Sequence, residues 1–113
     1  MSGAFHTALM KPAVPILKAA LEKVDVHHPR IPIYSNVDGK TMTQSGHIRK
    51  NLPKQVICPV KWEQSMVRMF DGYEQREDLM PSVYECGPGS GSLLGMLKAV
   101  NGKAGRKSKY IQV

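Results

Sequence analysis

A histidine near the start of the chain is the first side chain whose position could support chemistry. His6 stands in the segment SGAFHT, directly before residues with the spacing of a helix. The positive end of a helix dipole favours the neutral form of an imidazole, and a neutral imidazole can accept a proton. From the residues alone two interpretations of His6 stay open: a structural role at a helix start, or the general base of a catalysed reaction.

A general base of this kind needs a nucleophile, and a familiar arrangement places a serine in a G-x-S-x-G turn between a strand and a helix. No serine among the 113 residues has that spacing. The segment GPGSGS, residues 87–92, precedes an apolar run and is similar to a phosphate-binding loop. Because its glycines alternate and no Lys-Ser or Lys-Thr pair follows, we favour a tight strand-to-helix turn over a phosphate site.

The remaining histidines and cysteines lack the spacing of metal ligands. His27, His28 and His47 stand at intervals that match no common zinc motif. Cys58 and Cys86 lie far apart in the sequence, and neither belongs to a CxxC pair. We therefore predict no metal site and no disulfide, and we expect both thiols to be reduced, as in an intracellular compartment.

Apolar residues at intervals of three and four predict the first element, a helix with one buried face. The pattern covers residues 9–24, and because Pro12 and Pro15 each lack a backbone donor, we expect the regular part over about 14–24. β-Branched and aromatic residues then predict a buried strand at about 31–35, closed by a turn. The face expected to be buried on the helix holds Leu9, Ala13, Ile16, Leu17, Ala20, Leu21 and Val24.

Two further helices, a second strand and a last helix follow along the chain. Ser45 is the expected N-cap of a helix that reaches residue 57, and Pro53 should kink this helix or remove one hydrogen bond. The order of elements is typical of an α/β protein with a mostly parallel sheet flanked by helices. The other predicted elements are a helix over 62–70 that buries Trp62, Met66, Met69 and Phe70, a surface loop over 71–81, a buried strand over 82–87, a helix over 93–100 that buries Leu93, Leu94, Leu97 and Val100, and a short edge strand over 110–113.

An excess of positive charge narrows the classes of partner. The chain carries 16 Lys and Arg against 9 Asp and Glu, a net charge of +7, which favours anionic partners such as phosphates or acidic proteins. Part of the excess lies in residues 102–113, and we expect this basic tail to be solvated and partly disordered. Because no basic stripe is interleaved with aromatic residues and no apolar run could cross a bilayer, we predict neither a nucleic-acid partner nor a membrane one.

Four separated segments resemble one family of enzymes. They are SGAFHTALMKPA, PIYSNVDGK, KQVICPVKWEQSM and YECGPGSGSLLGMLK. In this order and spacing they are similar to the C-terminal half of the malonyl-CoA:acyl carrier protein transacylases, and most of all to the animal mitochondrial form. The resemblance covers Ser2 to about Asn101, within a domain segment taken as residues 1–101. It implies the C-terminal part of an α/β-hydrolase-like acyltransferase domain, which residues 102–113 follow as a basic tail.

The resemblance also implies roles for four residues. The family uses a serine nucleophile and a histidine base to move a malonyl group from coenzyme A to the phosphopantetheine thiol of acyl carrier protein, by a ping-pong route. His6 would be the base, and the backbone carbonyl of Gln55 would hold its second ring nitrogen. Phe5 and Asn36 would line the substrate cleft, with a core phenylalanine and a turn asparagine as the alternatives at these positions.

The same resemblance implies that part of the catalytic machinery is absent from this chain. The family's serine elbow, its oxyanion-hole glutamine and its arginine for the malonyl carboxylate belong before residue 1, so we expect the chain alone to be inactive. Malonyl-CoA is a substrate, no cofactor is expected, and the partners implied are coenzyme A and acyl carrier protein, with a monomer as the complete form. The location implied is the mitochondrial matrix in a eukaryote and the cytoplasm in a bacterium. The alternative is an inactive fragment or splice product that acts only through binding.

Overall fold

The structure is a computed structural model that describes residues 3–73, 75–87 and 91–111. The chain divides into two compact units, Met1–Ser65 and Met66–Val113. Helices and strands follow one another as in an α/β protein, so the predicted fold class is confirmed. The strands of the described residues form one antiparallel pair and one parallel pair.

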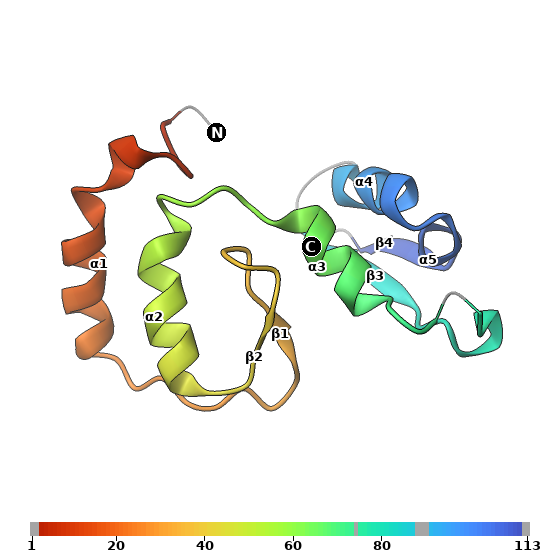
Figure 1. Cartoon of the computed structure of the whole chain (residues 1–113), viewed down its shortest axis with the longest axis horizontal. Coiled ribbons are helices and arrows are strands. Elements are labelled where there is room, and N and C mark those ends of the chain that lie inside the picture. The colour runs from red at the N-terminus through yellow and green to blue at the C-terminus, as the bar shows by residue number, and fades with distance from the viewer. Residues whose placement is uncertain (1–2, 74, 88–90, 112–113) are drawn as a thin grey trace. The chain divides into compact units, whose positions relative to one another are not determined.

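In the first unit two helices lie side by side (Figure 1). A single 3-10 turn, η1 (Ala8–Met10), leads into α1 (Ala13–Glu22), close to the predicted range. α1 packs against α2 (Ser45–Gln55), which lies 23 or more residues further along the chain. The sequence predicts an irregular start to this helix because of Pro12. In the structure that irregular start is the 3-10 turn η1 and the bend between it and α1.

Arg49 of α2 links these two helices. Its guanidinium donates to the carbonyl of Leu21 and, at 2.6 Å, to the carbonyl of Val24. Both acceptors lie at the C-terminal end of α1, where carbonyls have no donor inside the helix and where a positive charge is favourable. Arg49 thus caps α1 from the neighbouring helix, a contact that the spacing of apolar residues does not indicate.

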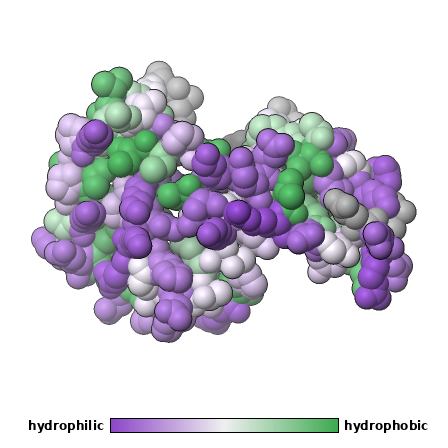
Figure 2. Space-filling model, in the orientation of Figure 1, coloured by the Kyte–Doolittle hydropathy of each residue, from purple (hydrophilic) through white to green (hydrophobic). Residues whose placement is uncertain are grey.

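α1 buries less of its apolar face than the helical spacing predicts. Leu17 and Leu21 are half-buried, whereas Leu9 is 78% exposed and Ile16 is 72% exposed. The main neighbour of α1 is α2, and a single helix covers only a narrow stripe of its partner. The prediction that the whole apolar face is buried is therefore wrong, and apolar residues remain on the surface of this unit (Figure 2).

The strand predicted at residues 31–35 is shorter than expected. β1 (Ile33–Tyr34) pairs antiparallel with β2 (Thr41–Met42). Ile33 is exposed, so the prediction of a buried strand is wrong at this position. The chain turns straight back into β2 instead of crossing over to a parallel neighbour.

A tight turn between β1 and β2 explains this reversal. The Ser35 N–H donates to the Lys40 carbonyl at 2.9 Å, and the Gly39 N–H donates to the Ser35 carbonyl at 2.8 Å. Gly39 has a φ of 63°, in the left-handed region that glycine adopts without steric cost. The sequence correctly indicates a turn here, and the turn makes a hairpin.

α2 begins and ends near its predicted bounds. Its N-cap is Gln44 rather than Ser45, and the Gln44 side chain makes no capping hydrogen bond. Pro53 lies in the last turn and is fully buried. Because proline has no N–H, it cannot donate the helical hydrogen bond of its position, which is the loss that the sequence predicts.

α3 (Trp62–Met69) matches the helix predicted over 62–70. Met69 is exposed, so its predicted burial is wrong. Ser65 is buried instead, and its hydroxyl donates to the Lys61 carbonyl at 2.9 Å. The members of the predicted face that are buried or half-buried are Trp62, Met66 and Phe70.

The second unit is built on a parallel strand pair. β3 (Val83–Cys86) pairs with β4 (Ser108–Ile111), and α4 (Ser92–Val100) and α5 (Gly102–Arg106) connect them. A connection of this length through helices is what a parallel pair requires. β3 and α4 lie where the strand and the helix are predicted, and the short 3-10 turn η2 (Glu77–Leu79) lies in the predicted loop. The predicted burial is wrong at Tyr84 and Cys86 of β3 and at Leu93 of α4, which are all exposed.

The predicted tail is not disordered over residues 102–111, because α5 and β4 both lie in it. Asn101 caps α5 by accepting from the Ala104 N–H at 3.0 Å. Ala104 and Gly105 are buried. The expectation of partial disorder is therefore corrected, and the predicted edge strand begins earlier than expected, at Ser108. Residues 112–113 lie outside the described residues.

Glu85 of β3 occupies the start of α4. The Leu94 N–H donates to one oxygen of its carboxylate at 2.9 Å, and the Leu93 N–H donates to the other at 3.3 Å. Gly91, with a φ of 75°, precedes the helix in the left-handed conformation. A carboxylate of the chain thus takes the place of an external anion, which favours the turn over the phosphate site. Residues 88–90 of the glycine-rich run lie outside the described residues.

Candidate active site

Three backbone carbonyls near the end of α2 hold His6. Its Nδ1 lies 2.8 Å from the carbonyl oxygen of Gln55 and 3.2 Å from that of Cys58. Its backbone N–H donates to the carbonyl of Val56 at 2.8 Å. The last carbonyls of a helix have no partner inside it, so the end of α2 offers acceptors to a neighbouring donor.

These contacts decide which ring nitrogen of His6 carries the proton. A carbonyl oxygen can only accept, so the Nδ1 that faces Gln55 and Cys58 is the donor. In a neutral ring the other nitrogen, Nε2, then has a free lone pair. Nε2 is therefore the atom that can take a proton from a reacting group.

The backbone of His6 adopts an uncommon conformation. Its φ is 62°, and it is the one non-glycine residue with a positive φ among those that the structure describes. For a residue with a Cβ this region costs about 1–3 kcal/mol, so the surrounding contacts must hold it. Residues held in this way are frequent at functional sites.

The helix-start interpretation of His6 is corrected by the structure. The element that follows is η1, a single turn capped by the hydroxyl of Thr7, and α1 begins only at Ala13. The helix end that His6 contacts is the C-terminal end of α2, which carries partial negative charge. The positive end of a helix dipole, which the sequence places beside His6, is therefore not the helix end that His6 meets.

The two predicted cleft residues, Phe5 and Asn36, both belong to the first unit. Phe5 directly precedes His6 and is 44% exposed. Asn36 is half-buried at the end of β1, and its carbonyl accepts from the Lys61 N–H at 2.8 Å. Among the described residues no hydrogen bond joins the Asn36 side chain to the His6 ring.

A polar network ties the hairpin turn to α2. Asn51 Nδ2 donates to the hydroxyl of Ser35 at 3.1 Å, and Ser35 is buried. Partial burial raises the pKa of Asp38, but hydrogen bonds and a nearby positive charge lower it more, so this pKa lies below its ordinary value. The donors are the Lys40 backbone and the side chains of Ser35 and Asn51, and the charge is that of Lys40. This network holds the turn that carries Asn36 against the helix whose end holds His6.

The described residues contain no cluster of three His, Cys, Asp or Glu side chains placed as metal ligands would be. Cys58 is half-buried and Cys86 is exposed, and both are free thiols. In the same residues no helix combines the length and the apolar character needed to cross a membrane.

Solved structures with a similar fold are acyltransferases. One is the MCAT of Streptococcus pneumoniae, with a TM-score of 0.76 and 28% identity over 99% of this chain and 33% of that chain. Another is a malonyl-transacylase solved in complex with a type II PKS acyl-carrier protein, with a TM-score of 0.72 and 27% identity over 100% of this chain and 33% of that chain. The fold is therefore that of the C-terminal part of an α/β acyltransferase.

Sequence comparison then narrows the class to one family. No protein-family profile matches the chain. It is 47% identical, over 109 residues, to the "Probable malonyl-CoA-acyl carrier protein transacylase, mitochondrial" of Drosophila melanogaster, a match that covers 96% of this chain. The chain is thus homologous to one segment of the malonyl-CoA:acyl carrier protein transacylases, which confirms the resemblance found in the four sequence segments. It spans 28% of the length of the Drosophila protein.

Proposed function

We propose that this chain supplies the histidine half of a malonyl transferase, which moves a malonyl group from malonyl-CoA to the phosphopantetheine thiol of acyl carrier protein in fatty acid synthesis. The observation that carries the proposal is the His6 Nδ1, held 2.8 Å from the Gln55 carbonyl. Two comparisons support it: the Drosophila relative is described as a malonyl transacylase, and a structural relative was solved with an acyl-carrier protein. The location proposed is the mitochondrial matrix for a eukaryotic source and the cytoplasm for a bacterial one.

In the first half-reaction His6 acts as a general base. Its Nε2 takes the proton of a serine hydroxyl, supplied by a segment outside residues 1–113, while the serine oxygen attacks the thioester carbonyl of malonyl-CoA. A carbon–oxygen bond forms and the carbon–sulfur bond then breaks. The proton on Nε2 passes to the departing thiolate of coenzyme A.

The second half-reaction reverses these roles with a new acceptor. The thiol of the carrier's phosphopantetheine arm gives its proton to Nε2 and attacks the malonyl ester of the serine. A carbon–sulfur bond forms, the ester carbon–oxygen bond breaks, and the serine oxygen takes the proton back. His6 therefore ends the cycle as the neutral ring with which it began.

The end of α2 would stabilise His6 whenever its ring is charged. The Gln55 and Cys58 carbonyls accept from Nδ1–H in both protonation states, and their bonds strengthen when the ring becomes positive. The negative end of the α2 dipole acts in the same direction. In this proposal backbone carbonyls do the work of the carboxylate in a Ser-His-Asp triad: they orient the ring and stabilise the imidazolium.

Phe5 and Asn36 are proposed as walls of the acyl-binding space. The Phe5 ring is exposed on the residue next to the base, so it is available to contact an acyl group and to narrow the space beside Nε2. Asn36 is fixed through its carbonyl to Lys61, which leaves its side-chain amide available for a polar substrate group. No cofactor enters this scheme, since malonyl-CoA is consumed as a substrate.

The activity of the isolated chain and of a chimera tests the proposal. The purified chain should transfer no malonyl group to holo acyl carrier protein, because none of its serines stands in a G-x-S-x-G turn. A chimera in which residues 1–113 replace the matching segment of the Drosophila relative should transfer it. Mass spectrometry of the carrier protein measures the product, with the unaltered Drosophila protein as the positive control.

Each outcome of this experiment has a definite meaning. Transfer by the isolated chain would show that the nucleophile lies within it and would contradict the proposed division of roles. A folded but inactive chimera would contradict the function itself. An inactive chimera that still binds the carrier protein would favour the alternative, a fragment that acts only through binding.

A further inference from the structure

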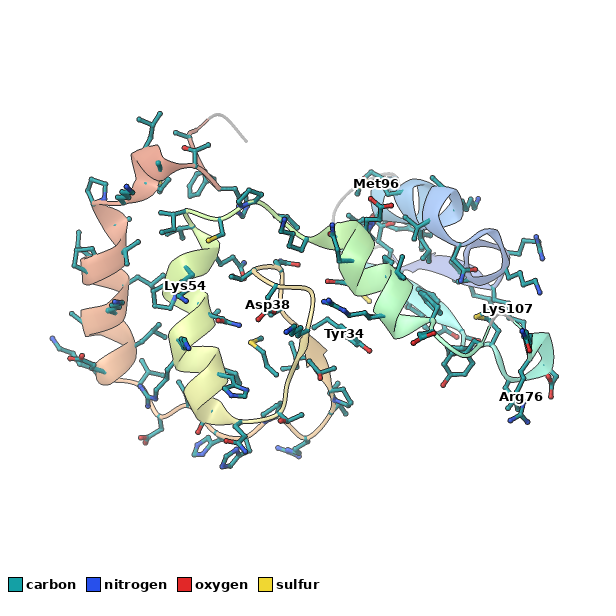
Figure 3. All side chains as sticks on the ribbon, in the orientation of Figure 1. Tyr34, Asp38, Lys54, Arg76, Met96 and Lys107 are labelled. Atoms are coloured by element: carbon teal, nitrogen blue, oxygen red, sulfur yellow. The ribbon has the colours of Figure 1, made fainter. Side chains whose placement is uncertain are left out.

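A groove of about 340 Å³ lies between α2 and the β1–β2 hairpin. Figure 3 shows Lys54 on α2 and Asp38 on the hairpin turn beside it. We call this feature the α2 groove. The polar and charged side chains that line it and matter here are Asp38, Lys40, His47, Lys50, Asn51 and Lys54.

One face of α2 supplies a row of groups to the α2 groove. Residues 47, 50, 51 and 54 have the spacing i, i+3, i+4 and i+7, so they share a single helix face. Seven residues of helix make this row about 10 Å long. Lys50 and Lys54 are exposed, and in the described part of the chain neither ammonium group has a hydrogen-bond or ion-pair partner.

The charge of the α2 groove is positive on balance. Three lysines line it against one carboxylate, that of Asp38. Hydrogen bonds from the turn and from α2 already occupy this carboxylate. Lys50 and Lys54 therefore present their charge outward, where a negatively charged partner could meet it.

We propose that the α2 groove is the docking site for an acidic protein surface. The inference rests on the proposed function, in which the acidic partner is the acyl carrier protein. Two exposed lysines one helical turn apart, with Lys40 on the hairpin facing the same groove, attract a partner that carries several spaced carboxylates, such as one face of an acidic helix. The partner bound in this way lies along the helix whose C-terminal carbonyl holds the base.

The shape and composition of the α2 groove favour a protein over a small phosphate. Phosphate sites bring donors to one point, often an arginine fork or the amides of a helix start. Here two of the three cations, Lys50 and Lys54, lie one turn apart on α2, the third, Lys40, lies on the hairpin, all three are lysines, and a carboxylate lies among them. Val37 and Met42 add apolar surface, as in the interfaces of proteins.

The position of the α2 groove agrees with this partner. Lys54 directly precedes Gln55, whose carbonyl lies 2.8 Å from the His6 ring. Both the row and the base are therefore fixed by one helix of the first unit.

Calorimetric titration of the 113-residue chain with holo acyl carrier protein tests the proposal. The double variant Lys50→Glu/Lys54→Glu should bind about tenfold more weakly than the unaltered chain, because two attractions become repulsions. The affinity of the unaltered chain should fall between ionic strengths of about 0.01 M and about 1 M, since exposed charges are screened by salt. The affinity of Lys50→Gln/Lys54→Gln should lie between those of the unaltered chain and the charge-reversed variant. This neutral variant replaces the charge-reversed one if charge reversal impairs folding.

The matched control is Lys18→Glu/Lys109→Glu, which makes the same change in net charge at two exposed lysines outside the α2 groove. The control should lose far less affinity than the groove variant. Equal losses in both would overturn the proposal, because only the total charge would then matter. Binding of inorganic phosphate in the α2 groove without binding of the carrier protein would also overturn it.

These outcomes are separate from the test of the proposed function. Binding is measured without any chemical step, so an inactive chimera leaves the docking result intact. Conversely, the chimera could be active while Lys50→Glu/Lys54→Glu binds the carrier protein as tightly as the unaltered chain. That pair of results would refute the docking site and support the proposed function.

Discussion

Replacement of His6 by alanine should lower malonyl transfer by the chimera about 10³-fold, the range lost with a positioned general base. The serine attack would then lack an acceptor for its proton. The loss should fall on kcat rather than on KM, because His6 acts on protons and not on substrate affinity. Steady-state rates with holo acyl carrier protein at several malonyl-CoA concentrations measure both constants.

The matched control for this substitution is His27→Ala, at an exposed histidine of the loop before β1. This variant should keep its rate within about twofold of the unaltered chimera, since surface substitutions seldom matter. Thermal unfolding of both variants checks that each is folded. A His6→Ala chimera that is folded and fully active would remove His6 from the mechanism.

Gly105→Ala should destabilise the chain by about 2 kcal/mol, the cost of adding a methyl group to a closely packed site. A Cβ built at Gly105 would lie 2.9 Å from the backbone Cα of Lys98, and it would also meet the side chain of that residue. A backbone atom cannot rotate away, so α5 and α4 would have to separate. Urea unfolding of the 113-residue chain, followed by circular dichroism, measures the change.

Gly95→Ala is the matched control, because a Cβ at this position of α4 would meet nothing within 4 Å. Alanine is the better helix former, so this variant should gain up to about 1 kcal/mol. The same Gly→Ala substitution should therefore lower the free energy of unfolding at position 105 and raise it at position 95. A neutral Gly105→Ala would contradict the close contact of α4 and α5.

The elements predicted best from the sequence are those with a clear apolar period. α3 and α4 lie where the spacing of three and four places them, and the short segment of β3, with a β-branched and an aromatic residue, is correctly predicted as a strand although alternate residues of it are exposed. The same spacing overestimates the burial of α1, since a period says which residues share a face but not how much of it a neighbour covers.

The last part of the chain shows why composition misleads. Lys, Gly and Ser dominate residues 102–109, and this mixture is typical of a solvated tail. Yet Gly105 permits the close approach of α5 to α4, and β4 pairs with a strand more than 20 residues earlier in the chain. Pairing between strands that lie far apart in the sequence is a tertiary effect, and the local conformational preferences of residues do not predict it.

The candidate site likewise has features that the sequence predicts and features that it does not. The spacing of residues could not indicate which carbonyls meet His6, because every residue has one, and only the resemblance to a family pointed to Gln55. The Cys58 carbonyl, the Arg49 cap of α1 and the Glu85 cap of α4 had no signal in the sequence analysis. Backbone acceptors and long-range caps are fixed by the fold, so they become visible only in three dimensions.

The protonation of the His6 ring is the most direct test of the central claim, that carbonyls at the end of α2 keep Nδ1 as the donor and leave Nε2 as the base. Long-range ¹H–¹⁵N NMR spectra of the histidine-labelled chain, at a pH where the ring is neutral, distinguish the two nitrogens. The signals are assigned to His6 by their loss in His6→Ala. We predict a proton on Nδ1 and a bare Nε2; a ring protonated on Nε2 would contradict the claim.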